Sequence, residues 1–140
     1  MRGRLALLLG VASAVGLGVK GARAWARRSK SRLSELPPDE LWGALGVEPD
    51  GRPTVVAFST PGCAVCRTTQ APALFDLESR LAGGVRVLRV DATAQPATAE
   101  VFEVATVPTT VVLASDGRVS EVNHGFAPAE MLEAQVSAAG

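Results

Sequence analysis

The strongest constraint on this chain is a pair of cysteines at the point where a predicted strand gives way to a predicted helix. Cys63 and Cys66 are the only cysteines among 140 residues. The apolar, β-rich run 54–58 precedes them, followed by a turn cluster of Ser, Thr, Pro and Gly. After the cysteines, apolar residues recur at spacings of three and four up to Leu81, which indicates a helix. The sequence therefore predicts a dithiol at the first turn of a helix.

This placement favours a reactive thiol. The first turn of a helix has N–H groups without intrahelical partners and lies at the positive end of the helix dipole, and both stabilise a thiolate. In such settings the pKa of a cysteine falls from about 8.5 to roughly 3.5–7.5. Cys63, at the helix start, is expected to be the exposed attacking thiolate. Cys66, one turn later on nearly the same face, is expected to be more buried and to act as the resolving thiol.

Other uses of a Cys-x-x-Cys motif are less favoured here. A closed zinc site needs about four ligands, and a chain with one His and two Cys would have to share such a site with a second chain. A purely structural disulfide would close a very small loop and constrain the unfolded chain little. Haem attachment requires His after the second cysteine, where this chain has Arg67. We therefore expect no metal, and no cofactor beyond the redox-active cysteine pair.

Charge divides the chain into two parts. Residues 1–35 carry eight Lys or Arg and one acid, whereas residues 36–140 carry six Lys or Arg and thirteen acids. A formal net charge of zero thus hides a basic head and an acidic body. The acidic body argues against nucleic-acid binding, and a membrane accounts better for the basic head.

The head contains a candidate membrane segment. Leu5–Val19 has no charge and no proline, and extension to residue 26 reaches the roughly 20 residues that a transmembrane helix needs. We expect residues 1–26 to be an uncleaved single-pass anchor that contacts the membrane through residues 5–26, with Trp25 in the interfacial belt. The alternative is a signal peptide with an A-x-A cleavage site at 22–24.

The basic residues that follow the apolar run predict its orientation. Cytoplasmic flanks carry the excess of Lys and Arg, and the excess lies between Lys20 and Arg32. The domain that follows is therefore expected on the cytoplasmic face, and a secreted or extracytoplasmic location is the alternative. Residues 27–36 are expected to be a basic linker, and residues 37–140 to form one domain.

Helical and strand patterns alternate along the body. The predicted helices are 38–45, 63–81, 97–104 and 128–137, and the predicted strands are 54–59, 85–90, 108–113 and 119–123. Strand–helix–strand units predict parallel pairing, and the final hairpin adds an antiparallel strand. The expected fold class is α/β, a mixed four-stranded sheet flanked by helices, with an N-terminal hydrophobic helix.

Some side chains carry individual expectations. Trp42 is expected in the core, and His124 at the surface where the last strand ends. In the closing helix, Met131, Leu132 and Val136 are expected to face inward. Pro72 is expected to kink the helix after the cysteines.

These motifs resemble the thioredoxin-fold family over about residues 39–137, and more narrowly the membrane-anchored thioredoxin-like proteins of bacteria. The matching segments are the strand 55–58 leading into Cys63-Ala64-Val65-Cys66, the strand 87–91, Val104–Thr109, and Asp116-Gly117 followed by Gly125. The resemblance implies that a cis peptide bond precedes Pro108, that Pro108 packs beside the dithiol, and that the backbone of Val107 pairs with bound substrate.

The chain also departs from the family pattern. Typical thioredoxins have Trp before the first cysteine, where this chain has Gly62, and a buried acid on the central strand, where it has Ala57. In the family that acid assists deprotonation of the resolving cysteine. Proton transfer at Cys66 must therefore use water or another group, for which Asp91 and Glu103 are candidates.

The resemblance and the dithiol together predict a thiol–disulfide oxidoreductase. It would exchange the Cys63–Cys66 pair with disulfides or thiols of proteins or small molecules at the membrane. One alternative is a non-catalytic thioredoxin-like adaptor that binds a membrane partner. A third hypothesis is an oxidoreductase that delivers redox equivalents to one dedicated partner protein.

Overall fold

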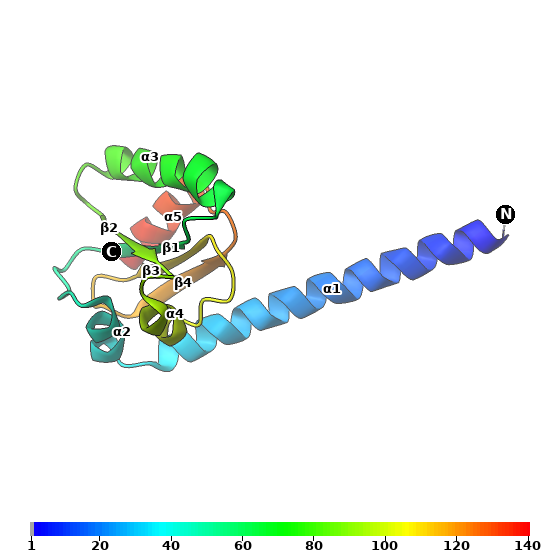
Figure 1. The fold of residues 1–140 in the computed structure, drawn as a ribbon, viewed down its shortest axis with the longest axis horizontal. Coiled ribbons are helices and arrows are strands. Elements are labelled where there is room, and N and C mark those ends of the chain that lie inside the picture. The colour runs from blue at the N-terminus through cyan, green and yellow to red at the C-terminus, as the bar shows by residue number, and fades with distance from the viewer. Residues whose placement is uncertain (1) are drawn as a thin grey trace.

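The computed structural model describes residues 2–140 as a four-stranded sheet between two layers of helices, from which one long helix projects (Figure 1). In chain order the elements are α1 (Arg2–Glu35), α2 (Pro38–Leu45), β1 (Thr54–Ser59), the π-helical turn η1 (Cys66–Gln70), α3 (Ala71–Leu81), β2 (Arg86–Asp91), α4 (Pro96–Val101), β3 (Thr109–Leu113), β4 (Val119–His124) and α5 (Ala129–Ala139). The predicted α/β class and the mixed four-stranded sheet are confirmed.

The strand order is β2-β1-β3-β4. β1 runs parallel to β2, β3 is antiparallel to β1, and β4 is antiparallel to β3. The expectation that every strand–helix–strand unit pairs in parallel is wrong for β3. The six residues of α4 rise only about 9 Å, whereas a six-residue strand spans about 20 Å. The chain therefore re-enters the sheet at the end where it left β2.

One end of the sheet carries the features that matter for function. Here β1 and β2 finish at Ser59 and Asp91, while β3 begins at Thr109, which pairs with both Phe58 and His124. We call this end the dithiol end, because Cys63 follows β1 here. The opposite end contains the turn between β3 and β4.

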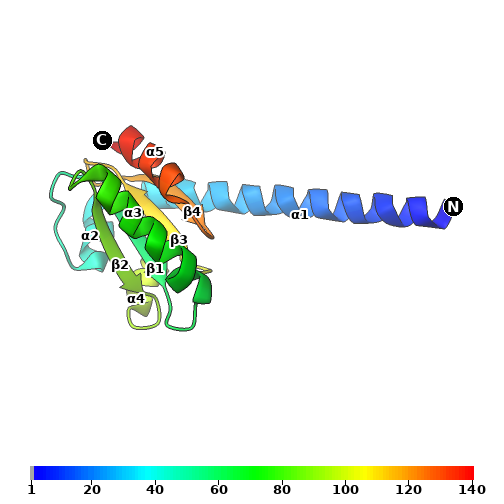
Figure 2. The ribbon, with the colours of Figure 1, turned by 90° about the horizontal axis from the view of Figure 1, so that it is seen from above.

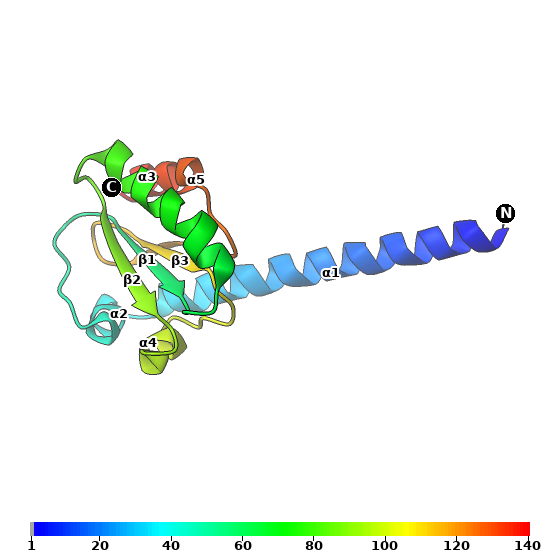
Figure 3. The same ribbon diagram turned by 45° about the horizontal axis from the view of Figure 1, so that its top comes forward.

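β1 is buried on both faces and divides the core in two. Val55 and Ala57 point to the face that α3 and α5 cover, and Val56 and Phe58 to the face packed with α2 and the end of α1 (Figure 3). Continuous burial of this kind is what an uninterrupted apolar strand predicts. Trp42 is buried at 4% exposure, as expected. Its Nε1 donates a 3.1 Å hydrogen bond to a backbone carbonyl in the β3–β4 turn.

The closing helix α5 matches its prediction only in part. Leu132 and Val136 are buried, but Met131 is 38% exposed. Leu132 and Val136 lie four residues apart on one face, whereas Met131 is displaced by about 100° around the helix from Leu132. Met131 therefore lies beside the buried stripe and not within it.

Helix α1 continues through the residues that were expected to form a linker. It is unbroken to Glu35, and its last turns pack on the sheet, with Leu33 fully buried and Ser29 at 4% exposure. These two positions are four residues apart and form a narrow inward stripe within a basic segment. Residues 27–35 are therefore a docked helix and not a polar connector.

The remainder of α1 projects away from the domain (Figure 2). Within residues 2–140, α1 is the one helix long and apolar enough to cross a membrane, and its apolar window makes no buried contact. A signal sequence near the N-terminus would satisfy the same criteria of length and composition.

Candidate functional site

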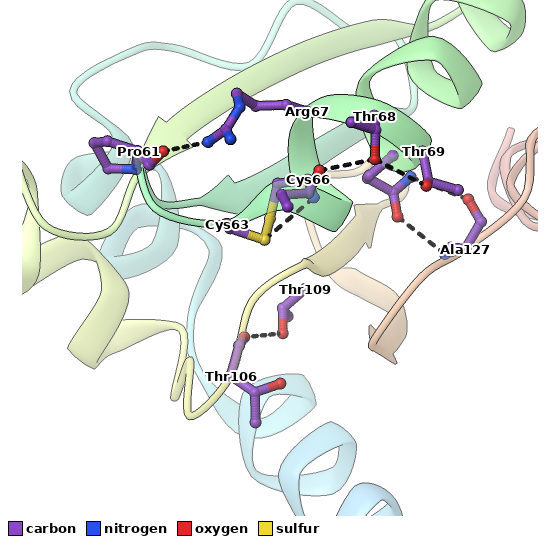
Figure 4. The surroundings of a disulfide bond; sticks show 11 residues. Pro61, Cys63, Cys66, Arg67, Thr68, Thr69, Thr106, Thr109 and Ala127 are labelled. Carbon is purple, nitrogen blue, oxygen red and sulfur yellow. Dashed lines mark hydrogen bonds between the residues drawn. A yellow bond between two sulfur atoms is a disulfide. The ribbon is translucent and has the colours of Figure 1, made fainter.

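The two cysteines lie directly after β1, at the dithiol end of the sheet (Figure 4). They form a disulfide, with an S–S distance of 2.15 Å and a Cα–Cα distance of 5.3 Å. Cys66 is 6% exposed and Cys63 is half-buried. The more accessible sulfur thus belongs to Cys63, and the sequence motif predicts this asymmetry.

One backbone amide hydrogen near the disulfide is directed toward the sulfur of Cys63. The N–H of Cys66 donates to Cys63 Sγ over 3.1 Å, and the N–H of Cys63 donates to the carbonyl of Thr60 over 3.1 Å. The amide on Sγ belongs to the first turn of the helical segment, whose N–H groups have no intrahelical acceptor. When the pair is reduced, this amide can stabilise negative charge on Cys63 in preference to Cys66.

The loop before Cys63 is braced from the side opposite the sulfur atoms. The Arg67 guanidinium donates to the carbonyl of Pro61. Figure 4 shows this contact above the loop, whereas the sulfur atoms point toward the segment between Thr106 and Thr109. Arg67 therefore holds the loop and leaves the sulfur side open.

The segment that faces the sulfur atoms contains the cis peptide bond that the resemblance implied, between Val107 and Pro108. Two hydrogen bonds fix it. Thr109 Oγ1 donates to the carbonyl of Thr106 over 2.7 Å, and the N–H of Gly125 donates to the carbonyl of Pro108 over 2.9 Å. Pro108 is buried and Val107 is half-buried. Both predicted substrate-binding residues thus lie opposite the dithiol.

A shallow depression of about 170 Å³ adjoins this segment, lined by Thr60, Ala92 and residues 104–107. Two exposed apolar side chains also flank the dithiol end. Val65 is 47% exposed and Phe126 is 44% exposed. An extended polypeptide segment placed here would meet apolar surface beside the sulfur atoms.

Gln70 is a structural part of the site that the sequence reasoning missed. Its side-chain Nε2 donates to the carbonyl of Ala127 over 3.0 Å, and its Oε1 accepts from the N–H of Ala127 over 2.9 Å. Gln70 is 3% exposed, so this pair joins η1 to the chain after β4 inside the protein. The available signal was its position one helical turn after Cys66, on the same inward face.

Gln70 ends a π-helical turn, where the sequence predicted a kink at Pro72. The N–H of Ala71 bonds to the carbonyl of Cys66, one residue further back than in an α-helix. Proline has no N–H to continue the regular ladder at the next position. The wider turn accommodates that loss, and Gln70 lines the same cavity as Cys66.

A cavity of about 60 Å³ lies next to Cys66, where the family pattern would place an acid. Ala57, Gln70 and Arg89 are among the residues that line it. Neither Asp91 nor Glu103 lines this cavity. The Asp91 carboxylate accepts hydrogen bonds from the Thr93 hydroxyl and backbone, which lower the pKa of Asp91.

Glu103, the other candidate for proton transfer at Cys66, lies 3.6 Å from the Arg32 guanidinium. The contacts of these two carboxylates are thus with Thr93 and Arg32, and neither carboxylate lines the cavity at Cys66. A cavity of this size at the resolving sulfur is large enough to hold water.

His124 differs from its prediction as a plain surface residue. Its ring lies 4.4 Å from the ring of Trp25, centroid to centroid, and both ring nitrogens are buried without a hydrogen-bond partner among the described residues. Burial lowers the pKa of His124 below its ordinary value. No sequence pattern links two positions so far apart, and the docking of α1 onto β4 brings them together.

No group of three or more His, Cys, Asp or Glu residues within the described chain is arranged to hold a metal ion. The chemistry that the residues at the dithiol end offer is that of the sulfur pair. It combines a half-buried sulfur that receives an amide hydrogen, a buried partner sulfur and a facing backbone segment.

Comparisons with known proteins agree with this arrangement. The Thioredoxin family model matches residues 46–138. Thioredoxin from Bacillus subtilis (strain 168) is 32% identical over 80 residues, which are 57% of this chain and 75% of that protein. Chloroplastic thioredoxin z matches in structure with a TM-score of 0.60 at 21% identity, covering 74% of this chain and 89% of its own.

A thiol:disulfide interchange protein from Chlorobium tepidum TLS also matches in structure, with a TM-score of 0.55 at 18% identity. The match covers 70% of this chain and 83% of that one. At these identities the two solved structures show a shared fold, while the family model spans most of the chain and includes both cysteines. This chain belongs to the thioredoxin family.

Proposed function

We propose that the protein is a membrane-anchored thiol–disulfide oxidoreductase, which exchanges its Cys63–Cys66 pair with disulfides and thiols of proteins or small molecules at the membrane. The observation that carries the proposal is the contact at Cys63 Sγ. This sulfur is half-buried, receives the Cys66 N–H over 3.1 Å, and faces the cis-proline segment. A merely structural disulfide needs neither a facing cis-proline segment nor an amide directed at one sulfur.

The exchange proceeds in two displacements. In the reduced protein the Cys63 thiolate attacks one sulfur of a substrate disulfide, so that a Cys63–substrate disulfide forms and the other substrate sulfur leaves as a thiolate and is protonated by solvent. Cys66 then loses its proton to water, and its thiolate attacks Cys63 Sγ and releases the second substrate sulfur. Two electrons pass to the substrate. The same steps in reverse, starting from the disulfide form and a dithiol substrate, oxidise the substrate.

The roles follow from position. Cys63 is the nucleophile because it is the more accessible sulfur and receives the amide, and Cys66 is the resolving thiol because it is buried beside it. Val107 would pair its backbone with the substrate chain, and Pro108 would pack beside the mixed disulfide. No cofactor takes part.

The basic segment after the apolar run supports a single-pass anchor with the domain on the cytoplasmic side. The location is tested with a membrane-impermeant thiol reagent applied to intact cells after mild reduction. Labelling of the cysteines only after permeabilisation would support the cytoplasmic side, and labelling without it would place the domain outside.

The exchange itself is tested with the full chain in detergent micelles, by following reduction of a model protein disulfide in the presence of dithiothreitol. The wild type is expected to accelerate the reaction, whereas Cys63→Ser is not. Equal rates for the two proteins would overturn the proposal.

Trapping separates the competing readings. Cys66→Ser should accumulate mixed disulfides through Cys63, and one dominant linked protein would indicate dedicated redox delivery. If a membrane partner is bound equally well by the double variant without cysteines, and no mixed disulfide forms, the adaptor reading replaces the enzyme.

A further inference from the structure

The contacts between α1 and β4 occur in a definite order along both elements. Trp25 lies on His124, at the end of β4, with ring centroids 4.4 Å apart. Five residues later, Lys30 Nζ lies 2.8 Å from the Glu121 carboxylate, nearer the start of β4. Going backward along α1 from Lys30 to Trp25 thus leads toward the end of β4.

That end of β4 belongs to the dithiol end of the sheet. His124 pairs with Thr109, the residue after Pro108, and the N–H of the following Gly125 bonds to the carbonyl of Pro108. Helix α1 therefore leaves the domain at the dithiol end. Figures 1 and 2 agree, because β4 points toward the side from which α1 projects.

The junction between α1 and the domain has no flexible link. The helix is continuous from Arg2 to Glu35, and Ser29 and Leu33 are buried against the domain. The charged contacts are partly exposed and contribute little to the free energy of docking. The buried stripe is therefore what fixes the orientation.

The spacing leaves little room between domain and membrane. The uncharged run ends at Val19, the expected membrane segment continues from there to residue 26, and the first docking contact is already made by Trp25. The helical rise between these residues is about 9 Å, and one polar headgroup layer is about 5–8 Å thick. If α1 spans a bilayer, the dithiol end must lie at the headgroup surface.

The charges at the junction fit such a surface. Lys20, Arg23, Arg27 and Arg28 surround the point where α1 leaves the domain and are all exposed. Basic residues next to a membrane are attracted to anionic headgroups by about 1 kcal/mol each. The apolar side chains of Val65 and Phe126 are exposed at the same end.

We propose that the docked end of α1 holds the dithiol toward the surface of the membrane that α1 crosses, so that its substrates are cysteines which other membrane proteins carry close to that surface. The proposal rests on the proposed function and its membrane anchor for the chemistry, but it makes a separate geometric claim. A flexibly tethered domain would reach soluble and membrane-borne disulfides alike. A domain held by the docked end of α1 would react preferentially with membrane-borne disulfides.

Orientation is measured with the full chain in vesicles of phosphatidylcholine and phosphatidylglycerol. A photo-reactive benzoylphenylalanine replaces Phe126 at the dithiol end or, as the matched control, Arg118 in the β3–β4 turn at the opposite end. Both positions are exposed. The probe at 126 is expected to crosslink to lipid several-fold more than the probe at 118, and equal or reversed yields would overturn the proposal.

A second variant uncouples orientation from folding. An insertion of about six Gly and Ser residues after Gly21 adds a flexible reach of about 13 Å and leaves the contacts of Trp25, Lys30 and Leu33 intact. Crosslinking at 126 should fall to the level at 118. If the difference between the two positions persists despite the insertion, the junction does not set the orientation.

The substrate class is tested with two disulfides in one preparation, one on a single-pass peptide close to the vesicle surface and one on a soluble protein. The insertion should lower exchange with the membrane-borne disulfide roughly three- to tenfold and leave the soluble reaction unchanged. An equal effect on both, or none on either, contradicts the proposal. Failure of the proposed function would look different, since lipid crosslinking at 126 would persist while neither disulfide reacted.

Discussion

The side-chain amide of Gln70 forms hydrogen bonds with both backbone polar groups of Ala127, at 3.0 and 2.9 Å, inside the protein. This pair connects the turn that carries Cys66 to the segment after β4, and no other described side chain bonds to the backbone of Ala127. Gln70 therefore supports the site by joining two of its backbone segments.

Replacing Gln70 with Leu should lower the free energy of unfolding by about 2–4 kcal/mol, because an N–H and a carbonyl would remain buried without partners. Chemical denaturation of the full chain in detergent measures this. Thr69→Ala, one residue earlier and exposed, is the control and should change stability by less than about 0.5 kcal/mol. Similar small effects of both changes would show that water replaces the lost partners.

The two thiols of the reduced protein should react at different rates. Cys63 is half-buried and receives an amide hydrogen, whereas Cys66 is 6% exposed. Iodoacetamide at neutral pH should therefore modify Cys63 first, as followed by peptide mass spectrometry. In Cys63→Ser the remaining thiol should react slowly, and a fast reaction there would reverse the assigned roles.

Ala57→Asp would place a carboxyl group in the cavity beside Cys66. We expect the resolving step at neutral pH to accelerate, because the carboxylate can take the Cys66 proton directly. Stability should fall by about 1–3 kcal/mol, because a polar group is buried with few partners. The decay of a preformed mixed disulfide, followed by stopped flow, measures the rate. Ala57→Asn is nearly isosteric but cannot take the proton, and equal rates in the two variants would exclude this role.

Acid should weaken the domain through His124. Burial lowers the pKa of His124 in the folded protein below the unfolded value of about 6.5. The unfolded chain therefore binds the proton more readily, so the stabilising contribution of neutral His124 is complete above about pH 6.5 and is lost as pH falls through the lowered pKa. Unfolding midpoints between pH 8 and pH 5 should fall further for the wild type than for His124→Phe. Parallel curves would contradict the assignment.

Leu33→Ala should lower the free energy of unfolding by about 2–4 kcal/mol, because Leu33 is fully buried between α1 and the sheet. Leu9→Ala lies on the same helix but outside the domain and should leave domain stability unchanged in detergent. If the two variants unfold alike, the contact between α1 and the sheet does not contribute to domain stability.

Local sequence patterns were sufficient for much of the fold. The apolar run 54–59, the cysteine spacing and the Asp116-Gly117 turn each specify a short element through neighbouring residues, and the structure contains all three. The prediction of a parallel β3 was wrong. The direction of β3 depends on the distance that helix α4 spans, and the apolar pattern of so short a segment does not establish that distance.

The interactions that sequence reasoning missed are the long-range ones. Leu33 is a single apolar side chain within a basic stretch, so nothing local indicated that residues 27–35 would pack on a sheet. Gln70 and Ala127 are far apart in sequence, as are Trp25 and His124. Such contacts depend on how the elements pack together in space. The spacing of apolar residues and the residue types in turns predict local structure but not these contacts.

Because α1 continues into the domain without a break, the rotation of the helix about its axis also fixes the direction in which the cysteine pair faces. Each residue inserted or deleted between Val19 and Trp25 would rotate the sheet by about 100° around the helix axis and move it by about 1.5 Å along that axis. In the membrane orientation proposed above, the number of residues in this short stretch sets the direction around the α1 axis in which the sulfur pair faces. Homologues that retain the cysteines but differ in length here would then present the pair in a different direction around the same helix.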